Sequence, residues 1–229
     1  MQTETIEPEL AKALGLLDNG MAEEALVLIE DLIKRLPEDS NLLFFRGDAL
    51  AELGETEKAI ASYSKGLESA PDATDAITTL GDLLFEAGRL DDALSSYRKA
   101  HKLAPDDPDT LVSIGLVQNA MENGTDAIAS FRQAIAKDGN NIFAWNALGD
   151  CLYGTGDHEG AIEAYQKGTE IDPKDPVAWH NLGELFYDLE EYEEAEENCL
   201  TAIKLAPDFC MSYLTLGEYA WIPRGCLMP

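Results

Sequence analysis

The chain has 229 residues and a formal net charge of −28, because 44 Asp and Glu residues outnumber 16 Lys and Arg residues. A field of this sign repels phosphate backbones and anionic lipid headgroups, so the composition argues against nucleic-acid and membrane-surface binding. A content of 45% hydrophobic residues is ordinary for a folded protein and argues against a disordered chain.

The start of the chain bears on its location. Residues 1–14 carry acids where a secretion signal would carry basic residues, and no apolar core follows them. No window of the sequence approaches the ~18 uninterrupted apolar residues that a membrane helix needs. We therefore expect a cytoplasmic protein that does not bind membranes.

After an N-terminal extension, 1–5, the sequence repeats with a period of 34 residues. Numbering positions from 1 within each repeat places small or turn-forming residues at positions 8, 20 and 32. Position 20 is always Ala, and position 8 is Gly in every repeat after the first. Six full repeats are expected, at 6–39, 40–73, 74–107, 108–141, 142–175 and 176–209.

Each repeat is expected to form two helices. Apolar residues at positions 4, 7 and 11 have helical spacing, as in Trp179, Leu182 and Phe186. A Gly near position 15 is typical of the turn after a helix, and Pro at position 32 ends the second helix. Because Gly costs a helix roughly 1 kcal/mol relative to Ala, we expect the position-8 glycines where the two helices touch and their backbones approach.

These columns resemble the tetratricopeptide repeat (TPR) family. One of the best copies of the pattern consists of Trp145, Leu148, Gly149, Ala161, Tyr165 and Pro173. The resemblance implies an all-α fold, a right-handed superhelical solenoid of antiparallel helix pairs whose first helices line a concave groove. Residues 210–222 would then form the first helix of a seventh repeat, acting as a C-terminal cap, and 223–229 an irregular tail.

The resemblance directs positions 2, 5, 9 and 12 of the first helices into that groove. Position 9 is mostly acidic and position 12 often aromatic, whereas Lys and Arg gather at positions 25 to 30 of the second helices. We therefore expect a basic or amphipathic peptide ligand, although acids on a water-facing helix are commonly only solvated. The expected peptide-binding residues are Phe44, Asp48, Thr78, Asp82, Phe85, Asn146, Asp150, Tyr153, His180, Asn181, Glu184 and Tyr187.

Catalytic chemistry has no support in the sequence. We find no nucleophile with a base, no phosphate-binding glycine loop and no spacing typical of metal ligands. His180 has no Cys or His partner at helical spacing, so a satisfied or exposed histidine is favoured over a metal ligand. The sequence predicts a non-enzymatic protein with no catalytic, cofactor-binding or metal residues and no cofactor.

A second hypothesis of a different class is a self-assembling scaffold. The expected helix at 210–222 has an apolar face formed by Tyr213, Leu216 and Ala220, and the second helix that would cover this face is missing. Three alternatives would cover the face: the tail at 223–229 folds back over it, two chains pair through it, or the sequence is a piece of a longer array of repeats. We favour pairing, which would bury the face and give a homodimer. Association that depends on concentration without a ligand would favour this hypothesis over peptide binding.

Overall fold

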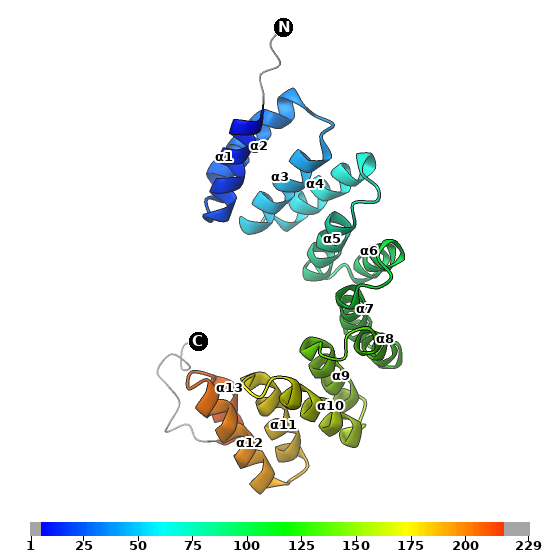
Figure 1. Ribbon diagram of the computed structural model, residues 1–229, viewed down its shortest axis with the longest axis vertical. Helices are drawn as coiled ribbons and strands as arrows, with labels where there is room; N and C mark the ends of the chain where they lie inside the picture. Colours follow the sequence, from blue (N-terminus) through cyan, green and yellow to red (C-terminus); the bar gives the residue numbers. More distant parts are fainter. Residues whose placement is uncertain (1–5, 218–229) are drawn as a thin grey trace. The chain divides into compact units, whose positions relative to one another are not determined.

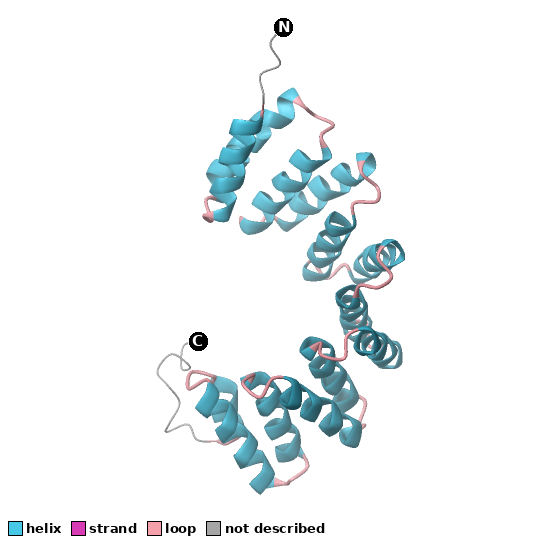
Figure 2. Cartoon of the chain, in the orientation of Figure 1, coloured by secondary structure: helices cyan, strands magenta, loops and turns pink. Residues whose placement is uncertain are grey.

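The computed structural model describes residues 6–217, and every regular element in that range is an α-helix (Figures 1 and 2). The predicted all-α architecture of packed helix pairs is therefore confirmed. None of the helices in this range has the length and apolar character needed to cross a membrane. The chain divides into two compact units, Met1–Thr110 and Leu111–Pro229, which we call the N-terminal unit and the C-terminal unit.

The N-terminal unit contains three helix pairs. Within each pair the two helices pack against each other, and the second helices of the first two pairs also pack against the first helix of the next pair. Apolar residues of both helices meet between them, as Ala13, Ala25, Ile29 and Ala49 do in one buried cluster. The helices are α1 (Glu7–Asp18), α2 (Ala22–Arg35), α3 (Ser40–Glu52), α4 (Thr56–Ser69), α5 (Thr74–Glu86) and α6 (Leu90–Leu103).

The C-terminal unit continues the same arrangement. Its first helix, α7 (Pro108–Ala120), begins in the last residues of the N-terminal unit. A short helix at the end of the described chain packs on both helices of the preceding pair. The remaining helices are α8 (Gly124–Lys137), α9 (Ile142–Gly154), α10 (His158–Ile171), α11 (Pro176–Asp188), α12 (Tyr192–Leu205) and α13 (Cys210–Thr215).

The position-8 glycines face an aromatic ring. A Cβ added to Gly47 would lie 2.5 Å from Tyr63 Cδ2, and one added to Gly81 would lie 2.7 Å from Tyr97 Cε1. The rings come from position 24 of the same repeat, so the glycine makes room for a side chain. The expected close approach of two backbones occurs at Gly183, whose added Cβ would lie 3.1 Å from the backbone nitrogen of Cys199.

Most turns after a first helix use glycine in the left-handed conformation, as the sequence predicts. Gly54, for example, has a φ of 74°. Two turns of the C-terminal unit place Glu122 and Glu190 in that conformation instead, each with a φ of 63°. A side chain with a Cβ is strained in this region, so these two turns carry a cost that the glycine turns avoid.

Candidate peptide-binding face

The acidic residues at position 9 are held by tyrosines of their own repeat. The hydroxyl of Tyr97 donates a hydrogen bond to Asp82 Oδ1 at 2.5 Å, and that of Tyr165 donates to Asp150 Oδ1 at 2.7 Å. Tyr63 donates to Asp48 in the same way. These three carboxylates therefore have a structural role within the helix pair.

Positions 9 and 24 change together along the chain. Two repeats have Leu at position 9 and an apolar residue at position 24. Leu14 goes with Ile29 in the first repeat, and Leu116 goes with Phe131 in the fourth. The last full repeat differs, because Glu184 stands at position 9 and the buried Cys199 at position 24. Glu184 is therefore the one position-9 carboxylate in the described repeats that has no tyrosine donor.

Partial burial raises the pKa of Asp48 and of Asp150, and the tyrosine hydrogen bonds oppose this effect. The negative charge of Glu184 also raises the pKa of Asp150. Burial and the neighbouring carboxylate raise the pKa of Tyr165 as well, which keeps its hydroxyl protonated as a donor. The Tyr–Asp pairs are thus partly desolvated contacts of the fold.

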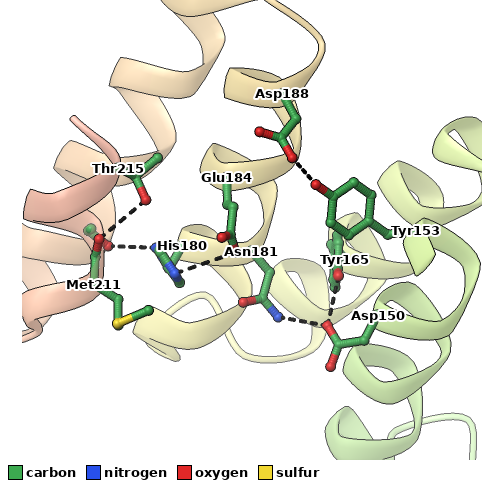
Figure 3. Close-up of polar contacts among 10 residues, drawn as sticks. Asp150, Tyr153, Tyr165, His180, Asn181, Glu184, Asp188, Met211 and Thr215 are labelled. Atoms are coloured by element: carbon green, nitrogen blue, oxygen red, sulfur yellow. Dashed lines mark hydrogen bonds and ion pairs between the residues drawn. The ribbon is translucent and has the colours of Figure 1, made fainter. Parts of the chain in front are cut away.

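In the C-terminal unit, polar side chains connect the first helices α9 and α11 (Figure 3). Asn181 Nδ2 donates to Asp150 Oδ1 at 3.4 Å, and the hydroxyl of Tyr153 donates to Asp188. Glu184 lies on α11 between these two contacts (Figure 3), and its side chain is 52% exposed. Three carboxylates and an aromatic ring therefore share one face of two neighbouring helices.

An exposed tyrosine pair extends this face. Tyr187 on α11 is 47% exposed, and its ring meets that of Tyr192 edge to face with the ring centroids 5.6 Å apart. The sequences of α9, α11 and α13 contain no Lys or Arg. We call the surface formed by Asp150, Tyr153, Glu184, Tyr187 and Asp188 the acidic face.

His180 is among the expected peptide-binding residues, but the structure buries it away from the acidic face. It is 5% exposed, its Nδ1 lies 3.1 Å from Ser212 Oγ, and its ring packs on that of Phe209. Burial lowers its pKa, and the nearby Glu184, 3.8 Å from Nε2, opposes this effect. The helix α13 covers position 5 of the preceding repeat, which removes His180 from contact with a ligand.

Other expected residues at position 5 pack within their own repeat. The ring of Phe44 stacks on that of Tyr63 and occupies the space where a Cβ of Gly66 would lie. Asn146 points its Oδ1 at Gly168. Thr78 donates to the backbone oxygen of its own helix one turn earlier. These three side chains are partly buried, and among the described residues no hydrogen-bond partner is present for the buried Asn146 Oδ1.

The N-terminal unit has a separate depression of about 530 Å³ between α1 and α3, the first helices of its first two repeats. Position 9 contributes Asp48 to it. Phe85 and Asp82 of α5 lie outside its lining. The depression is lined by Leu14, Leu17, Asp18, Phe45, Asp48, Ala51 and Glu52.

Two groups of surface residues were missed in the sequence. Asp188 stands at position 13, outside the four columns that the resemblance directs into the groove. Position 2 is one of those columns, and from α9 onward it holds the exposed apolar residues Phe143, Val177 and Met211. A comparison of the repeats shows the change from polar to apolar residues at position 2, whereas position 13 is acidic in several repeats and gives no such signal for Asp188.

Family models match most of the chain. A model described as TPR repeat matches residues 81–121 and 149–189, and two models described as Tetratricopeptide repeat match residues 10–74 and 176–209. Together these ranges cover more than half of the sequence. A search of curated proteins gave no match.

Solved structures with the same fold include several TPR proteins. YrrB, a TPR protein with an unusual peptide-binding site, is 24% identical with a TM-score of 0.61, covering 82% of this chain and 97% of YrrB. The pilF protein of Pseudomonas aeruginosa is 19% identical with a TM-score of 0.73, covering 93% of this chain and 96% of that chain.

A tetratricopeptide repeat protein from Parabacteroides merdae is 16% identical with a TM-score of 0.81, covering 93% of this chain and 84% of that chain. At these identities the likeness concerns the fold alone. The repeat columns, the packed helix pairs and the matching family models agree with one another. The chain belongs to the tetratricopeptide repeat family.

Proposed function

We propose that this protein is a non-enzymatic interaction module that binds a basic or amphipathic segment of a partner protein on its acidic face. TPR repeats as a family support protein–protein interaction, and a structural neighbour has a peptide-binding site. The observation that carries the proposal is Glu184, a half-exposed carboxylate without a tyrosine donor beside the exposed Tyr187. Apart from His180 Nε2 at 3.8 Å, the described residues give this carboxylate no cationic neighbour, so its exposed side can pair with a ligand cation.

The chemistry of the acidic face selects the ligand. Asp150, Glu184 and Asp188 supply negative charge, and no first helix of the C-terminal unit supplies a base to neutralise it. A Lys or Arg side chain of the ligand gains favourable contacts with these carboxylates, and its aliphatic stem or an apolar neighbour packs on Tyr187. An acidic ligand would be repelled by the same groups.

The scaffold hypothesis leads to a different measurement. Tyr213 and Leu216 are half-buried, and the hydroxyl of Tyr213 donates to the backbone oxygen of Pro207 at 3.1 Å. Ala220, the third residue of the predicted pairing face, lies outside the described residues. Sedimentation of the ligand-free protein over a hundredfold concentration range separates the two functions, because pairing alone makes the mass depend on concentration.

Peptide binding is tested with a fluorescent peptide that contains Lys, Arg and Leu, together with a matched peptide in which Glu replaces each base. We expect anisotropy to show binding of the basic peptide, weakening as the screening length falls from ~10 Å at 0.1 M salt to ~3 Å at 1 M. Glu184→Gln should weaken binding about fivefold, the equivalent of about 1 kcal/mol. Equal binding of the acidic peptide would refute the proposal.

Glu196→Gln is the matched control. Glu196 is an exposed acid on α12, a second helix of the same unit, and the substitution removes the same charge from the protein. We expect it to leave the affinity nearly unchanged. If Glu184→Gln and Glu196→Gln weaken binding equally, only the overall charge matters and the acidic face has no special role.

A further inference from the structure

Exposed apolar side chains form a line across the first helices of the C-terminal unit. Phe143 on α9 is 82% exposed, Val177 on α11 is 40% exposed and Met211 on α13 is 51% exposed. All three stand at position 2 of successive repeats, and we call them the position-2 stripe. Regularly placed apolar side chains that a fold leaves in water are typical of a surface that a partner covers.

The same column is polar in the N-terminal unit. There, position 2 holds Glu7, Asn41 and Asp75, all of them exposed. The helix-pair scaffold therefore does not require an apolar residue at this position. The change to Phe, Val and Met begins at α9, because α7 still has Asp109 at position 2. Glu184, in the same part of the chain, also lacks a tyrosine donor.

The position-2 stripe runs parallel to the acidic face. On one helix, positions 2 and 9 are seven residues apart, which is close to two full turns and places both side chains on the same side, about 10.5 Å apart along the axis. The helices α11 and α13 pack on each other, and the Asn181–Asp150 and Tyr153–Asp188 hydrogen bonds link α9 to α11. Helices in such contact lie about 8–10 Å from one another. A ligand that crosses these helices therefore meets apolar contacts roughly every 10 Å, with carboxylates about 10 Å to one side.

This spacing fits a helix and does not fit an extended strand. Residues i, i+7 and i+14 of an α-helix lie on one face at intervals of about 10.5 Å. A strand covers about 10 Å in three residues, but its side chains alternate, so residues i and i+3 point to opposite faces. An α-helix about 10–12 Å wide can also reach both lines at once.

We propose that the position-2 stripe and the acidic face together bind an amphipathic helix of a partner protein. The bound helix presents apolar residues at seven-residue spacing to Phe143, Val177 and Met211, and Lys or Arg residues on one flank to Glu184. This inference rests on the proposed function and adds the conformation and the sequence pattern of the ligand. Charge complementarity selects such a helix over the acidic surface of a second copy of this chain.

Two synthetic peptides of identical composition test the proposal against the full chain. The heptad peptide has Leu at i, i+7 and i+14 with Lys on one flank, and the scrambled peptide distributes the same Leu and Lys residues around the helix. We expect the heptad peptide to bind at least about tenfold more tightly, and its circular dichroism to show helix formation on binding. Equal affinities, or binding without helix formation, would overturn the proposal.

Phe143→Ser tests the stripe itself, because a side chain that is 82% exposed contributes little to the fold. We expect this variant to bind the heptad peptide about fivefold or more weakly and to retain its melting temperature. Val27→Ser is the control, since Val27 on α2 is also an exposed apolar residue, at 68%, but lies in the N-terminal unit. An unchanged affinity in Phe143→Ser would contradict the proposal.

The outcomes separate this inference from the proposed function. Both peptides could bind with equal affinity that Glu184→Gln weakens and Phe143→Ser leaves unchanged. In that case the acidic face binds basic peptides and the helix proposal is wrong. If neither peptide binds, both proposals are wrong. If the ligand-free protein associates with itself and Phe143→Ser abolishes the association, a second copy covers the stripe and the partner helix is refuted.

Discussion

The two units of the molecule share a scaffold and differ in the surface that it presents. Both place Gly against an aromatic ring at positions 8 and 24, as in Gly47 with Tyr63 and Gly149 with Tyr165. At position 2, the N-terminal unit has polar residues where the C-terminal unit has the position-2 stripe. The comparison shows that the residues repeated throughout the chain maintain the fold, whereas residues that change between units are candidates for recognition.

The largest expected effect tests the shared scaffold. Gly149→Leu would push a side chain into the ring of Tyr165, and Gly47→Leu would do the same to Tyr63. Overpacking of this kind costs about 1–3 kcal/mol or more, and we expect similar losses in the free energy of unfolding for both variants, measured in urea. A loss confined to one variant would show that the two units do not share this contact.

Gly154→Leu is the control for the glycine variants. Gly154 ends α9, and a Cβ added there would meet no atom within 4 Å. We expect this substitution to leave the unfolding free energy nearly unchanged. A loss as large as that of Gly149→Leu would mean that leucine destabilises the helix wherever it replaces glycine.

The sequence predicted the scaffold well because its signals are periodic. The Gly, Ala and Pro columns located the helix pairs, and the Asp175-Pro176 pair marks a helix start at which Asp175 accepts from the Val177 amide at 3.0 Å. The predicted approach of two backbones at the position-8 glycine occurs at Gly183, whereas an aromatic ring fills this space in the repeats of Gly47 and Gly149. A pattern of small residues does not show which atoms lie beside them.

The candidate site was predicted less completely. The sequence predicts ligand carboxylates at position 9, and it does not reveal that Asp48, Asp82 and Asp150 also accept hydrogen bonds from tyrosines fifteen residues later. His180 was placed on the ligand side, but α13 buries it. Such contacts between helices depend on three-dimensional packing, and a single column of the repeat does not reveal them.

A smaller effect tests the Tyr–Asp pairs, which occur in both units. Tyr165→Phe removes the donor of Asp150 and should destabilise the protein by about 1 kcal/mol at neutral pH. Tyr63→Phe should act in the same way on Asp48. Chemical denaturation at several pH values checks both variants, and a loss in only one unit would limit the pair's role to that unit.

The pH dependence of Tyr165→Phe has a defined sign. The folded state raises the pKa of Asp150, so ionising this carboxyl lowers stability as the pH rises from the unfolded pKa through the folded pKa. The tyrosine hydrogen bond limits that loss, and removing it raises the folded pKa further. The variant should therefore lose more stability at neutral pH than at about pH 4, the ordinary pKa of Asp, and an equal loss at both would exclude this linkage.

The smallest effect concerns the turns that distinguish the C-terminal unit. Glu122→Gly and Glu190→Gly should each stabilise the protein by about 0.5–1 kcal/mol, because strain at positive φ is relieved while the unfolded chain gains some freedom. The reverse change, Gly54→Ala in the N-terminal unit, should destabilise it. Thermal melts check these signs, and destabilisation by both Glu→Gly changes would show that these side chains contribute more than the strain costs.

The central claim is that ligand recognition belongs to the acidic face of the C-terminal unit. The most direct test compares Glu184→Lys with Glu52→Lys, an identical charge reversal beside the depression of the N-terminal unit. In titrations with the Lys-, Arg- and Leu-containing peptide, we predict a loss of affinity of at least about tenfold, or about 1.4 kcal/mol, for Glu184→Lys and little change for Glu52→Lys. An equal or larger loss in Glu52→Lys would contradict the account.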